Sequence, residues 1–355
     1  MKRFLSLVFL CTICCSALMA QDATAFDQQM LQMRKDAANT RLAINPVTPF
    51  DCADPSVVQI DDWFYCFKTG FPVGIYRSKD LCNWEFYRNM FPGKSPRDPY
   101  GDGKLDPMKT KAKDNEHINY WAPSPALING KVVVYLTLFV SMENDRQVVC
   151  VADDIDSEFR YVNTLNVGNP EHPTPQDGQY FLDDDGRQYL VYGDVNSKGN
   201  YIRELAPDGI HYAKGSKPYY ITTAYEGGYV YKHNGKYYFF CSKNHYNTYE
   251  YTLCVSTSDS LTGGWTEPED ILVSESKDAI LNGPGHNGEI ITDKNGRMFM
   301  VMHCHCDGLI PKRGDYNQRP MILMELKDID GRLTFVDHKG SPTRHPQWLV
   351  NAPEF

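Results

Sequence analysis

The most constraining feature of this sequence is a hairpin pattern that occurs five times. Each copy has a leading residue, a run that favours a β-strand, a tight turn and a second run rich in aromatic and β-branched residues. Further strand-like runs follow each hairpin, and four antiparallel strands per repeat predict an all-β fold, a five-bladed β-propeller. The leading residues are Asp54, Trp121, Asp177, Glu226 and Asn287.

A radial arrangement of these hairpins would bring the leading residues to one axis. Three of them, Asp54, Asp177 and Glu226, are carboxylic acids. Acids placed close together raise at least one pKa, so that one group stays protonated while another is ionised. Glycoside hydrolysis uses such a division between two carboxyl groups. Aspartate beside Pro or Gly also occurs in ordinary turns, but three acids at equivalent positions favour an active site.

The termini and the charge limit where the protein acts and what it binds. Two basic residues precede an apolar run at positions 4–18, and small residues follow, which predicts a signal peptide over residues 1–20 and an exported, periplasmic or extracellular protein. A lipid-anchored form using a cysteine of this leader is the alternative. The net charge of −9 without a basic run argues against nucleic acid as a partner. No other stretch is long and apolar enough to predict a membrane span.

The remaining chain is divided into two parts. Residues 21–49 are expected to form a lead-in segment, either a short helix or an irregular arm, and residues 50–355 a single propeller domain. The stretch 318–335 is expected to complete the first or last blade, and the long polar segment 89–119 to form one wall of a cleft. Eight cysteines lie outside the leader, and we expect them to be free and buried: Cys52, Cys66, Cys82, Cys150, Cys241, Cys254, Cys304 and Cys306.

Five short motifs in this order resemble family 43 of the glycoside hydrolases, from about residue 50 to 335. They are Ala53–Val58, Trp121-Ala122-Pro123, Asp177 ahead of Asp183–Gly186, Glu226-Gly227 before a tyrosine-rich run, and Gly283–Asn287. The resemblance implies a five-bladed propeller that hydrolyses α-L-arabinofuranosides, β-D-xylosides or related galactans with inversion. It also implies that Asp54 is the general base, that Glu226 is the general acid, and that Asp177 tunes and orients the acid.

The same resemblance implies three substrate-binding residues. Trp121 is expected to stack on a sugar, and Arg319 to reach the sugar near the acid. His286 matches an axial histidine that helps to hold calcium or ordered water, so a structural calcium near it is possible, although no cofactor is required. The run from His303 to Cys306 alternates on a strand, and we expect no zinc site there, because its histidines and cysteines point to opposite faces.

Some positions depart from the family pattern or stand outside it. Ser124 replaces an acid that is common after Trp-Ala-Pro, and we expect altered sugar contacts. Gly228 replaces a bulkier residue, which would widen the pocket. Trp63 is expected to pack rather than to bind sugar. The triplet 97–99, Arg-Asp-Pro, resembles a motif of fructan-cleaving propellers but lies out of register with the repeats, so we interpret it as coincidence.

These observations predict an exported, inverting glycoside hydrolase acting on plant-type oligo- or polysaccharides. Arabinan or arabinoxylan side chains are the preferred substrates, and exo and endo action remain open. A β-xylosidase or galactan-active enzyme of the same family is one alternative. A non-catalytic carbohydrate-binding propeller is another, and a retaining fructan-type hydrolase, with carboxyl groups only ~5 Å apart instead of ~6.5–9.5 Å, is a third.

Overall fold

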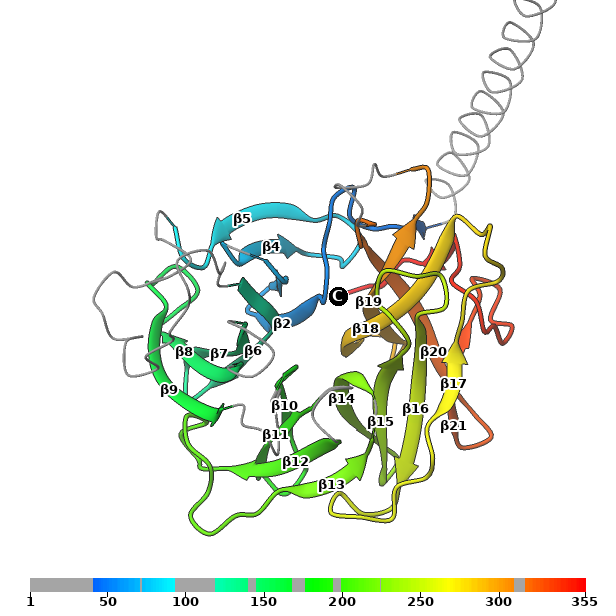
Figure 1. Cartoon of the computed structure of the whole chain (residues 1–355). Helices are drawn as coiled ribbons and strands as arrows, with labels where there is room; N and C mark the ends of the chain where they lie inside the picture. The colour runs from blue at the N-terminus through cyan, green and yellow to red at the C-terminus, as the bar shows by residue number, and fades with distance from the viewer. Residues whose placement is uncertain are drawn as a thin grey trace, which may run out of the picture.

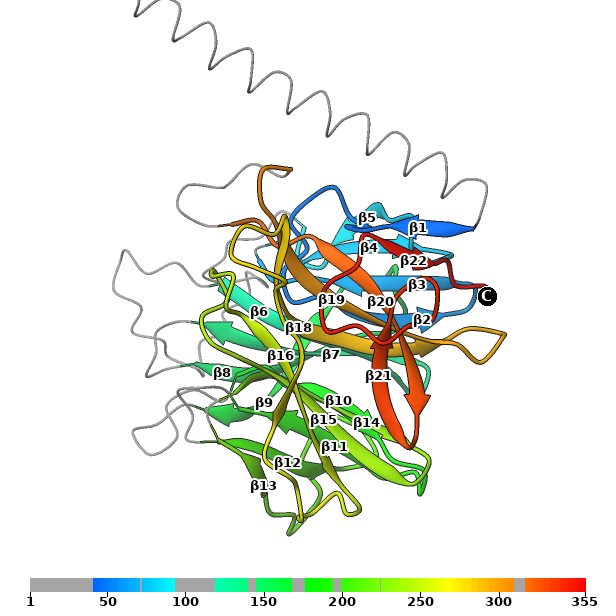
Figure 2. The same cartoon turned by 90° about the vertical axis from the view of Figure 1, so that its right-hand side faces the viewer.

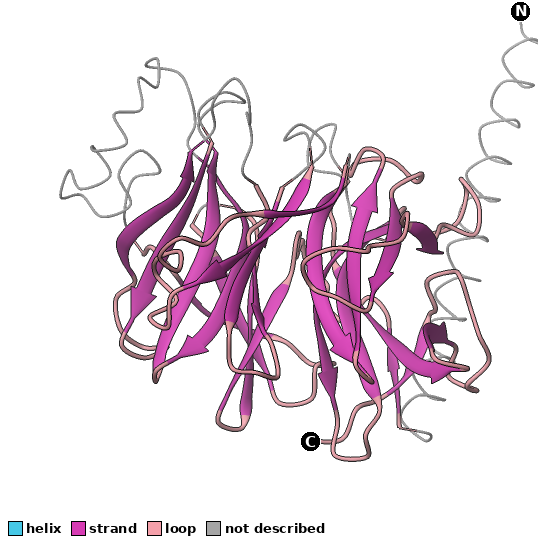
Figure 3. Cartoon of the chain, turned by 90° about the horizontal axis from the view of Figure 1, so that it is seen from below, coloured by secondary structure: helices cyan, strands magenta, loops and turns pink. Residues whose placement is uncertain are grey.

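The structure, a computed structural model, describes residues 41–70, 72–92, 119–139, 145–167, 176–193, 199–223, 225–309 and 317–355. Within these ranges the regular secondary structure consists of β-strands, with no helix (Figure 3). Five four-stranded antiparallel sheets surround one axis, with β2, β6, β10, β14 and β18 nearest to it (Figure 1). The predicted five-bladed propeller is therefore confirmed. No helix of the described part has the length and apolarity that a membrane span requires.

Each blade is formed by four strands that follow one another in the chain. Blade 1 contains β2 (Ser56–Ile60), β3 (Trp63–Phe67), β4 (Gly74–Ser78) and β5 (Glu85–Asn89), and blade 2 contains β6 (Asn119–Ile128), β7 (Lys131–Phe139), β8 (Arg146–Ala152) and β9 (Arg160–Val167). Blade 3 contains β10 (Gln179–Leu182), β11 (Gln188–Tyr192), β12 (Asn200–Leu205) and β13 (Tyr219–Thr222). Blade 4 contains β14 (Glu226–His233), β15 (Lys236–Lys243), β16 (Thr252–Ser258) and β17 (Glu269–Leu272), and blade 5 contains β18 (Leu281–Thr292), β19 (Met298–Cys306), β20 (Met321–Ile329) and β21 (Arg332–Val336).

The two ends of the described chain meet beside blade 5. Strand β1 (Leu42–Ile44) pairs with β22 (Leu349–Asn351), and the two lie side by side in Figure 2. The described end of the lead-in segment is thus a strand rather than a helix. The side-chain amide of Asn45 donates to the carbonyl of Leu323 and accepts from its N–H. The stretch 318–335 completes the last blade, as one of the two sequence-based alternatives predicted. Most of segment 89–119, including the triplet 97–99, and the predicted signal peptide lie outside the described residues.

Turn chemistry sets the register of the inner hairpins. Both residues of the turns Asn129-Gly130 and Asn234-Gly235 have positive φ, which the tight two-residue hairpin turn requires and which Asn and Gly adopt at low cost. Ile128 pairs with Lys131 and His233 with Lys236 across these turns. The predicted hairpins therefore form at these two turns.

Apolar side chains fill all five spaces between neighbouring blades. Five separate buried clusters lie between blades 1 and 2, 2 and 3, 3 and 4, 4 and 5, and 5 and 1. Each sheet is thus covered on both faces, which explains why the strands are so rich in aromatic residues. Trp63 packs under the guanidinium of Arg77, 4.2 Å from its ring centre, as expected for a packing residue. All eight described cysteines are free, and Cys82 alone among them is not fully buried.

Glu289 joins the last blade to the first. From β18, its carboxylate accepts hydrogen bonds from the Ser56 hydroxyl, at 2.6 Å, and from the Val57 N–H, both on β2. Burial raises the pKa of Glu289 to about 7. Next to it, a Cβ on Gly288 would lie 2.4 Å from the carbonyl oxygen of Pro55, so the two blades approach closely here. This contact closes the ring without exchanging a strand between blades.

Replacement of Glu289 by glutamine is expected to weaken the pH dependence of stability. Between the ordinary glutamate pKa and about 7 the folded protein holds a proton that the unfolded chain releases, so stability is full below about 4.5 and falls as the pH rises towards 7. The slope is at most ~1.4 kcal/mol per pH unit for one group. Thermal melts between pH 5 and 7.5 should show a shallower decline in Glu289→Gln than in the wild type; parallel curves would contradict this.

Candidate active site

Every inner strand is preceded or interrupted near its axial end by a residue in the left-handed region. These residues have φ between 42° and 61°, which is strained for side chains other than Gly and, more mildly, Asp or Asn. They are Asp54, Ala122, Asp177, Gly227 and His286. The true equivalent positions therefore differ from the predicted leading residues in three blades, because Trp121 and Glu226 stand one residue earlier and Asn287 one residue later. A change in strand pairing at each of these three places accounts for the offset.

The backbone N–H of each left-handed residue donates to a side chain of the preceding blade. The five contacts run around the axis as a closed ring. They are Ala122 to Thr69 Oγ1 at 2.8 Å, Asp177 to Thr137 Oγ1 at 3.1 Å, Gly227 to Asp177 Oδ2 at 2.9 Å, His286 to Ser242 Oγ at 2.8 Å, and Asp54 to His303 Nδ1 at 3.3 Å. This ring holds the strained backbone in place and fixes where the neighbouring side chains point.

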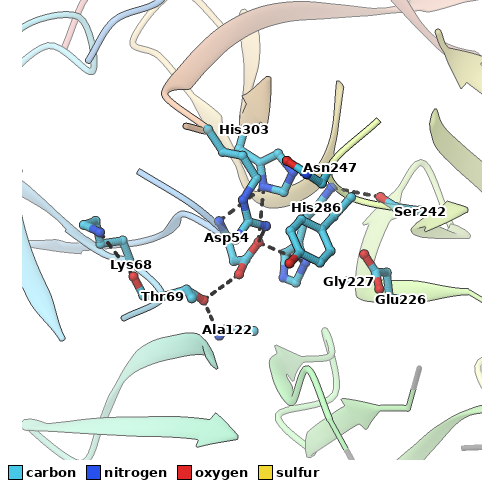
Figure 4. A network of polar contacts seen from close by, with 12 residues as sticks. Asp54, Lys68, Thr69, Ala122, Glu226, Gly227, Ser242, Asn247, His286 and His303 are labelled. Carbon is cyan, nitrogen blue, oxygen red and sulfur yellow. Dashed lines mark hydrogen bonds and ion pairs between the residues drawn. The ribbon is translucent and has the colours of Figure 1, made fainter. Parts of the chain in front are cut away.

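Asp54 lies at the centre of a charged network (Figure 4). Its Oδ1 is 2.9 Å from the Arg319 guanidinium and 3.4 Å from Nδ1 of His286, and its Oδ2 accepts from the Thr69 hydroxyl at 2.5 Å. Burial by itself would raise the pKa of Asp54, which is 7% exposed, but Arg319 and the neighbouring histidines hold that pKa well below the usual aspartate range. Asp54 is therefore ionised at any pH near neutrality.

His303 supports Asp54 from β19. Its Nδ1 lies 3.3 Å from the Asp54 nitrogen and 3.2 Å from Oδ1, and the side chain is fully buried. Burial lowers the pKa of His303 to about 3, so the ring is neutral and Arg319 is the principal positive charge that faces Asp54. His303 therefore contacts Asp54 as a neutral ring.

Glu226 has the opposite environment. Burial and the negative charge of Asp177 raise its pKa to about 7, although the hydroxyl of Tyr251, which donates to Oε1 at 2.6 Å, partly offsets the rise. Glu226 is the first residue of β14, and Gly227, which follows it, donates its N–H to Asp177. Asp177 thus acts on Glu226 both through its charge and by anchoring the adjacent backbone.

Replacing Gly227 by alanine should disturb this anchor. A Cβ would lie 2.9 Å from Cγ of His286, and the φ of +61° disfavours any side chain. We expect a loss of about 1–3 kcal/mol in unfolding free energy together with a lower kcat. The matched control is Gly235→Ala, where φ is +79° but the space is open. Equal stability losses in the two variants would show that contact with His286 is unimportant.

The structure separates the roles expected for Arg319 and Trp121. Arg319 contacts Asp54, the predicted base, through its guanidinium, and its backbone N–H donates to Asp51. Its guanidinium also lies 4.6 Å from the ring centre of Tyr246. Trp121 stacks on Phe139, with ring centroids 3.9 Å apart, which covers one face of its ring. Trp121 is partly exposed, and the ring face away from Phe139 is the one on which we expect a sugar to stack.

Ser124 and Gly228, two positions that depart from the family pattern, lie in the packed interior. The Ser124 side chain is buried, donates to Gln179 Oε1 at 2.9 Å and accepts from the N–H of Tyr180, so it connects blade 2 to blade 3. A Cβ on Gly228 would lie 2.7 Å from the ring of Phe239 and 3.4 Å from Val191, within the core between blades 3 and 4. Neither residue reshapes a pocket in the way the sequence suggested.

The described residues do not assemble a protein metal site. They contain no group of three or more His, Cys, Asp or Glu side chains placed to hold a metal. Calcium prefers six to eight oxygen ligands, whereas Asp54, the carboxylate paired with His286, is already engaged by Arg319, and Glu226, whose pKa His286 lowers, accepts a hydrogen bond from Tyr251. His305 bonds to Asn282 and to the carbonyl of Tyr246, whereas Cys304 and Cys306 are buried in the apolar cluster between blades 4 and 5. The donors near His286 thus fit calcium poorly.

Sequence reasoning missed two residues of this site. Thr69, between β3 and β4, joins Asp54 to Ala122 of the next blade. Tyr251, just before β16, donates to Glu226 from a fully buried position. Thr69 follows the second strand of blade 1 by two residues, and Tyr251 directly precedes the third strand of blade 4. Nothing in their local sequence distinguishes them from the other threonines and tyrosines.

Comparisons with known proteins show which family the chain belongs to. The profile described as "Glycosyl hydrolases family 43" matches residues 43–328. The chain is 24% identical over 324 residues to an extracellular endo-α-(1→5)-L-arabinanase of Thermotoga petrophila, covering 75% of this chain and 66% of that protein. It is 24% identical over 280 residues to a xylosidase/arabinosidase of Humicola insolens, covering 72% of this chain and 48% of that protein.

Solved structures show the same fold. An α-L-arabinanase of Cellvibrio cellulosa is similar with a TM-score of 0.65 at 19% identity, covering 83% of this chain and 99% of that one. A xylan β-1,4-xylosidase of Bacillus halodurans is similar with a TM-score of 0.67 at 22% identity, covering 88% and 59%. The chain thus spans about two thirds or less of the two curated relatives named above. Because the family profile covers most of the sequence, the chain belongs to glycosyl hydrolase family 43.

Proposed function

We propose that this glycoside hydrolase cleaves α-L-arabinofuranosidic bonds of arabinan or arabinoxylan side chains with inversion. The observation that carries the proposal is the opposite tuning of two axial carboxyl groups. Arg319 holds Asp54 ionised, whereas burial and the charge of Asp177 raise the pKa of Glu226 to about 7, so that Glu226 is protonated below that pH. One base and one acid at the same axis are the two groups that this reaction requires.

In the proposed reaction, Asp54 accepts a proton from water as the water attacks the anomeric carbon. Glu226 donates its proton to the departing glycosidic oxygen, and the C–O bond to the leaving group breaks. Asp177 anchors the backbone next to Glu226 and raises the acid's pKa by its charge. Trp121 supplies an aromatic face for a sugar ring, and Arg319 keeps Asp54 ionised. The donors near His286 fit calcium poorly, and no metal is needed for these steps.

The pH profile of kcat/KM is expected to be bell-shaped. Activity should appear as Asp54 ionises, below the usual aspartate range, and decline as Glu226 loses its proton near pH 7. The charged or titratable groups facing Glu226 are Asp177, Tyr251, His286 and Asp54. Initial rates between pH 3 and 9 on one substrate test this. An alkaline limb at pH 9 or above would contradict the assignment of Glu226 as the acid.

A substrate screen tests the proposed specificity. Wild-type protein is assayed with 4-nitrophenyl α-L-arabinofuranoside, β-D-xyloside and β-D-galactoside and with linear arabinan, and NMR detects the anomer released first. We expect the arabinofuranoside or arabinan to be hydrolysed best, with an inverted product. A retained anomer would overturn inversion. Absence of turnover on every substrate would overturn the catalytic proposal and favour a carbohydrate-binding propeller.

A β-xylosidase activity is the second candidate. It is supported by the xylosidase/arabinosidase of Humicola insolens among the relatives and by the fold likeness to a xylan β-1,4-xylosidase. Faster hydrolysis of the xyloside in the same screen would favour it. Export is part of the proposal as well, because the leader at residues 1–20 has secretory character and one similar arabinanase is described as extracellular.

A further inference from the structure

A buried tyrosine contacts Glu226 but has no role in the reaction proposed above. Tyr251 lies between β15 and β16 with a fully buried side chain, and its hydroxyl donates to Glu226 Oε1 at 2.6 Å. This distance lies within the range of a strong hydroxyl–carboxyl hydrogen bond. It occupies one carboxyl oxygen of Glu226 and leaves the other, Oε2, to carry the transferable proton.

Packing holds the tyrosine ring in one orientation. The ring stacks on His303, with centroids 5.4 Å apart and planes inclined by 9°, and His303 contacts Asp54. On another side the ring lies against Gly285, where a Cβ would come within 2.3 Å of its Cε1. Burial also raises the pKa of Tyr251 well above its ordinary value, so the hydroxyl remains a donor throughout the working pH range.

We propose that Tyr251 is a positioning residue of the reaction, which fixes the rotamer of Glu226 so that Oε2 points its proton at the glycosidic oxygen. The inference rests on the proposed acid role of Glu226. Through its ring, Tyr251 also couples the placement of the acid to that of His303 and hence of Asp54. Acid and base are thereby held in one relative geometry by a single aromatic pair, without a direct contact between them.

The position of Tyr251 gives it a second effect on the acid. Its hydrogen bond favours the ionised carboxylate and so opposes the rise in the pKa of Glu226 that burial and Asp177 produce. The four groups facing Glu226 are Asp177 on blade 3, Tyr251 on blade 4, His286 on blade 5 and Asp54 on blade 1. Removing the hydroxyl leaves the other three in place, so the alkaline limb of the activity profile should move upwards.

Tyr251→Phe tests the proposal because it removes the hydroxyl and keeps the ring. We expect kcat on an aryl glycoside with a poor leaving group, such as the phenyl glycoside, to fall about tenfold or more. With a 2,4-dinitrophenyl leaving group, which departs without protonation, the loss should be less than about threefold. The alkaline limb should shift upwards by up to about one pH unit. Equal losses on both leaving groups with an unchanged pH profile would overturn the proposal.

A matched control separates positioning from general destabilisation. Tyr135 is equally buried, and its hydroxyl donates at the same 2.6 Å, but to the carbonyl of Gly209 between blades 2 and 3. Tyr135→Phe should change the melting temperature without moving the pH profile. Gly285→Ala pushes on the Tyr251 ring from outside and should reproduce the leaving-group dependence of Tyr251→Phe. If it lowers activity equally for both leaving groups, the ring position is not what matters.

A measurement without substrate distinguishes failure of this inference from failure of the proposed function. The pKa of Glu226 is followed by NMR on protein labelled with ¹³C at glutamate carboxyls, with Glu226→Gln identifying the signal. Tyr251→Phe should raise this pKa whether or not a substrate has been found. An unchanged or lower pKa would overturn the inference even in an active enzyme. An inactive wild type with a raised pKa in the variant would overturn only the proposed function.

Discussion

Replacing Glu226 by glutamine should lower kcat/KM on glycosides with poor leaving groups by about 10²- to 10⁴-fold, the usual contribution of a general acid. The amide retains an oxygen that accepts from Tyr251, so the fold around the site should persist. Because the protonated acid and the amide are both neutral, the buried position is not left with a new charge. The expected loss therefore reflects the missing proton rather than a displaced side chain.

The leaving group again provides the discriminating measurement. With a 2,4-dinitrophenyl glycoside, Glu226→Gln should retain activity within about tenfold of the wild type, since this alcohol departs as an anion. The alkaline limb near pH 7 should disappear from its profile, because it arises from Glu226 in the wild type. A variant that loses activity equally on both leaving groups and keeps that limb would show that another group is the acid.

Replacing Asp54 by asparagine should lower kcat by about 10²- to 10⁴-fold whatever the leaving group, because the attacking water loses its base. Asparagine is the appropriate substitution, since it also tolerates the φ of +51° at this position. Added azide needs no base to attack the anomeric carbon and should restore turnover with a glycosyl azide as product. No rescue together with intact folding would argue against Asp54 as the base.

Asp54→Asn also carries a stability cost that must be measured alongside activity. It leaves Arg319, whose side chain is 15% exposed, without its partner at 2.9 Å. Removing one member of a largely buried ion pair costs about 3–5 kcal/mol when the other charge remains. Asp51→Asn is the matched control. Asp51 also contacts Arg319, by accepting its backbone N–H, but it is not one of the groups named above that shift the pKa of Glu226. It should change kcat by less than about tenfold.

Much of the fold was predictable because its signals are local. Positive φ at Asn129-Gly130 and Asn234-Gly235 follows directly from the residue types, and the continuous aromatic and β-branched runs fit sheets that are covered on both faces. The offset of Glu226 and Trp121 from the left-handed positions was not predictable. It depends on irregular pairing within β14 and β6, which only the neighbouring strand reveals.

The departures from the family pattern illustrate the same limit. Ser124 and Gly228 stand beside catalytic motifs in the sequence, and proximity suggested a role in the pocket. In the structure their side-chain positions face Gln179 and Phe239 of neighbouring strands and contribute to blade packing. Adjacent residues of a strand point to opposite faces, so closeness in sequence to a catalytic residue does not place a side chain in the site.

The sequence by itself determined the fivefold hairpin repeat and the identity of the acids on it, because turn residues and strand periodicity act over a few positions. Only the tertiary structure decided what each acid does. Arg319, 265 residues from Asp54, keeps that carboxyl ionised, and Tyr251, 25 residues from Glu226, holds the acid in place. Charge and hydrogen bonding depend on distance in space, and the ring of five blades sets those distances.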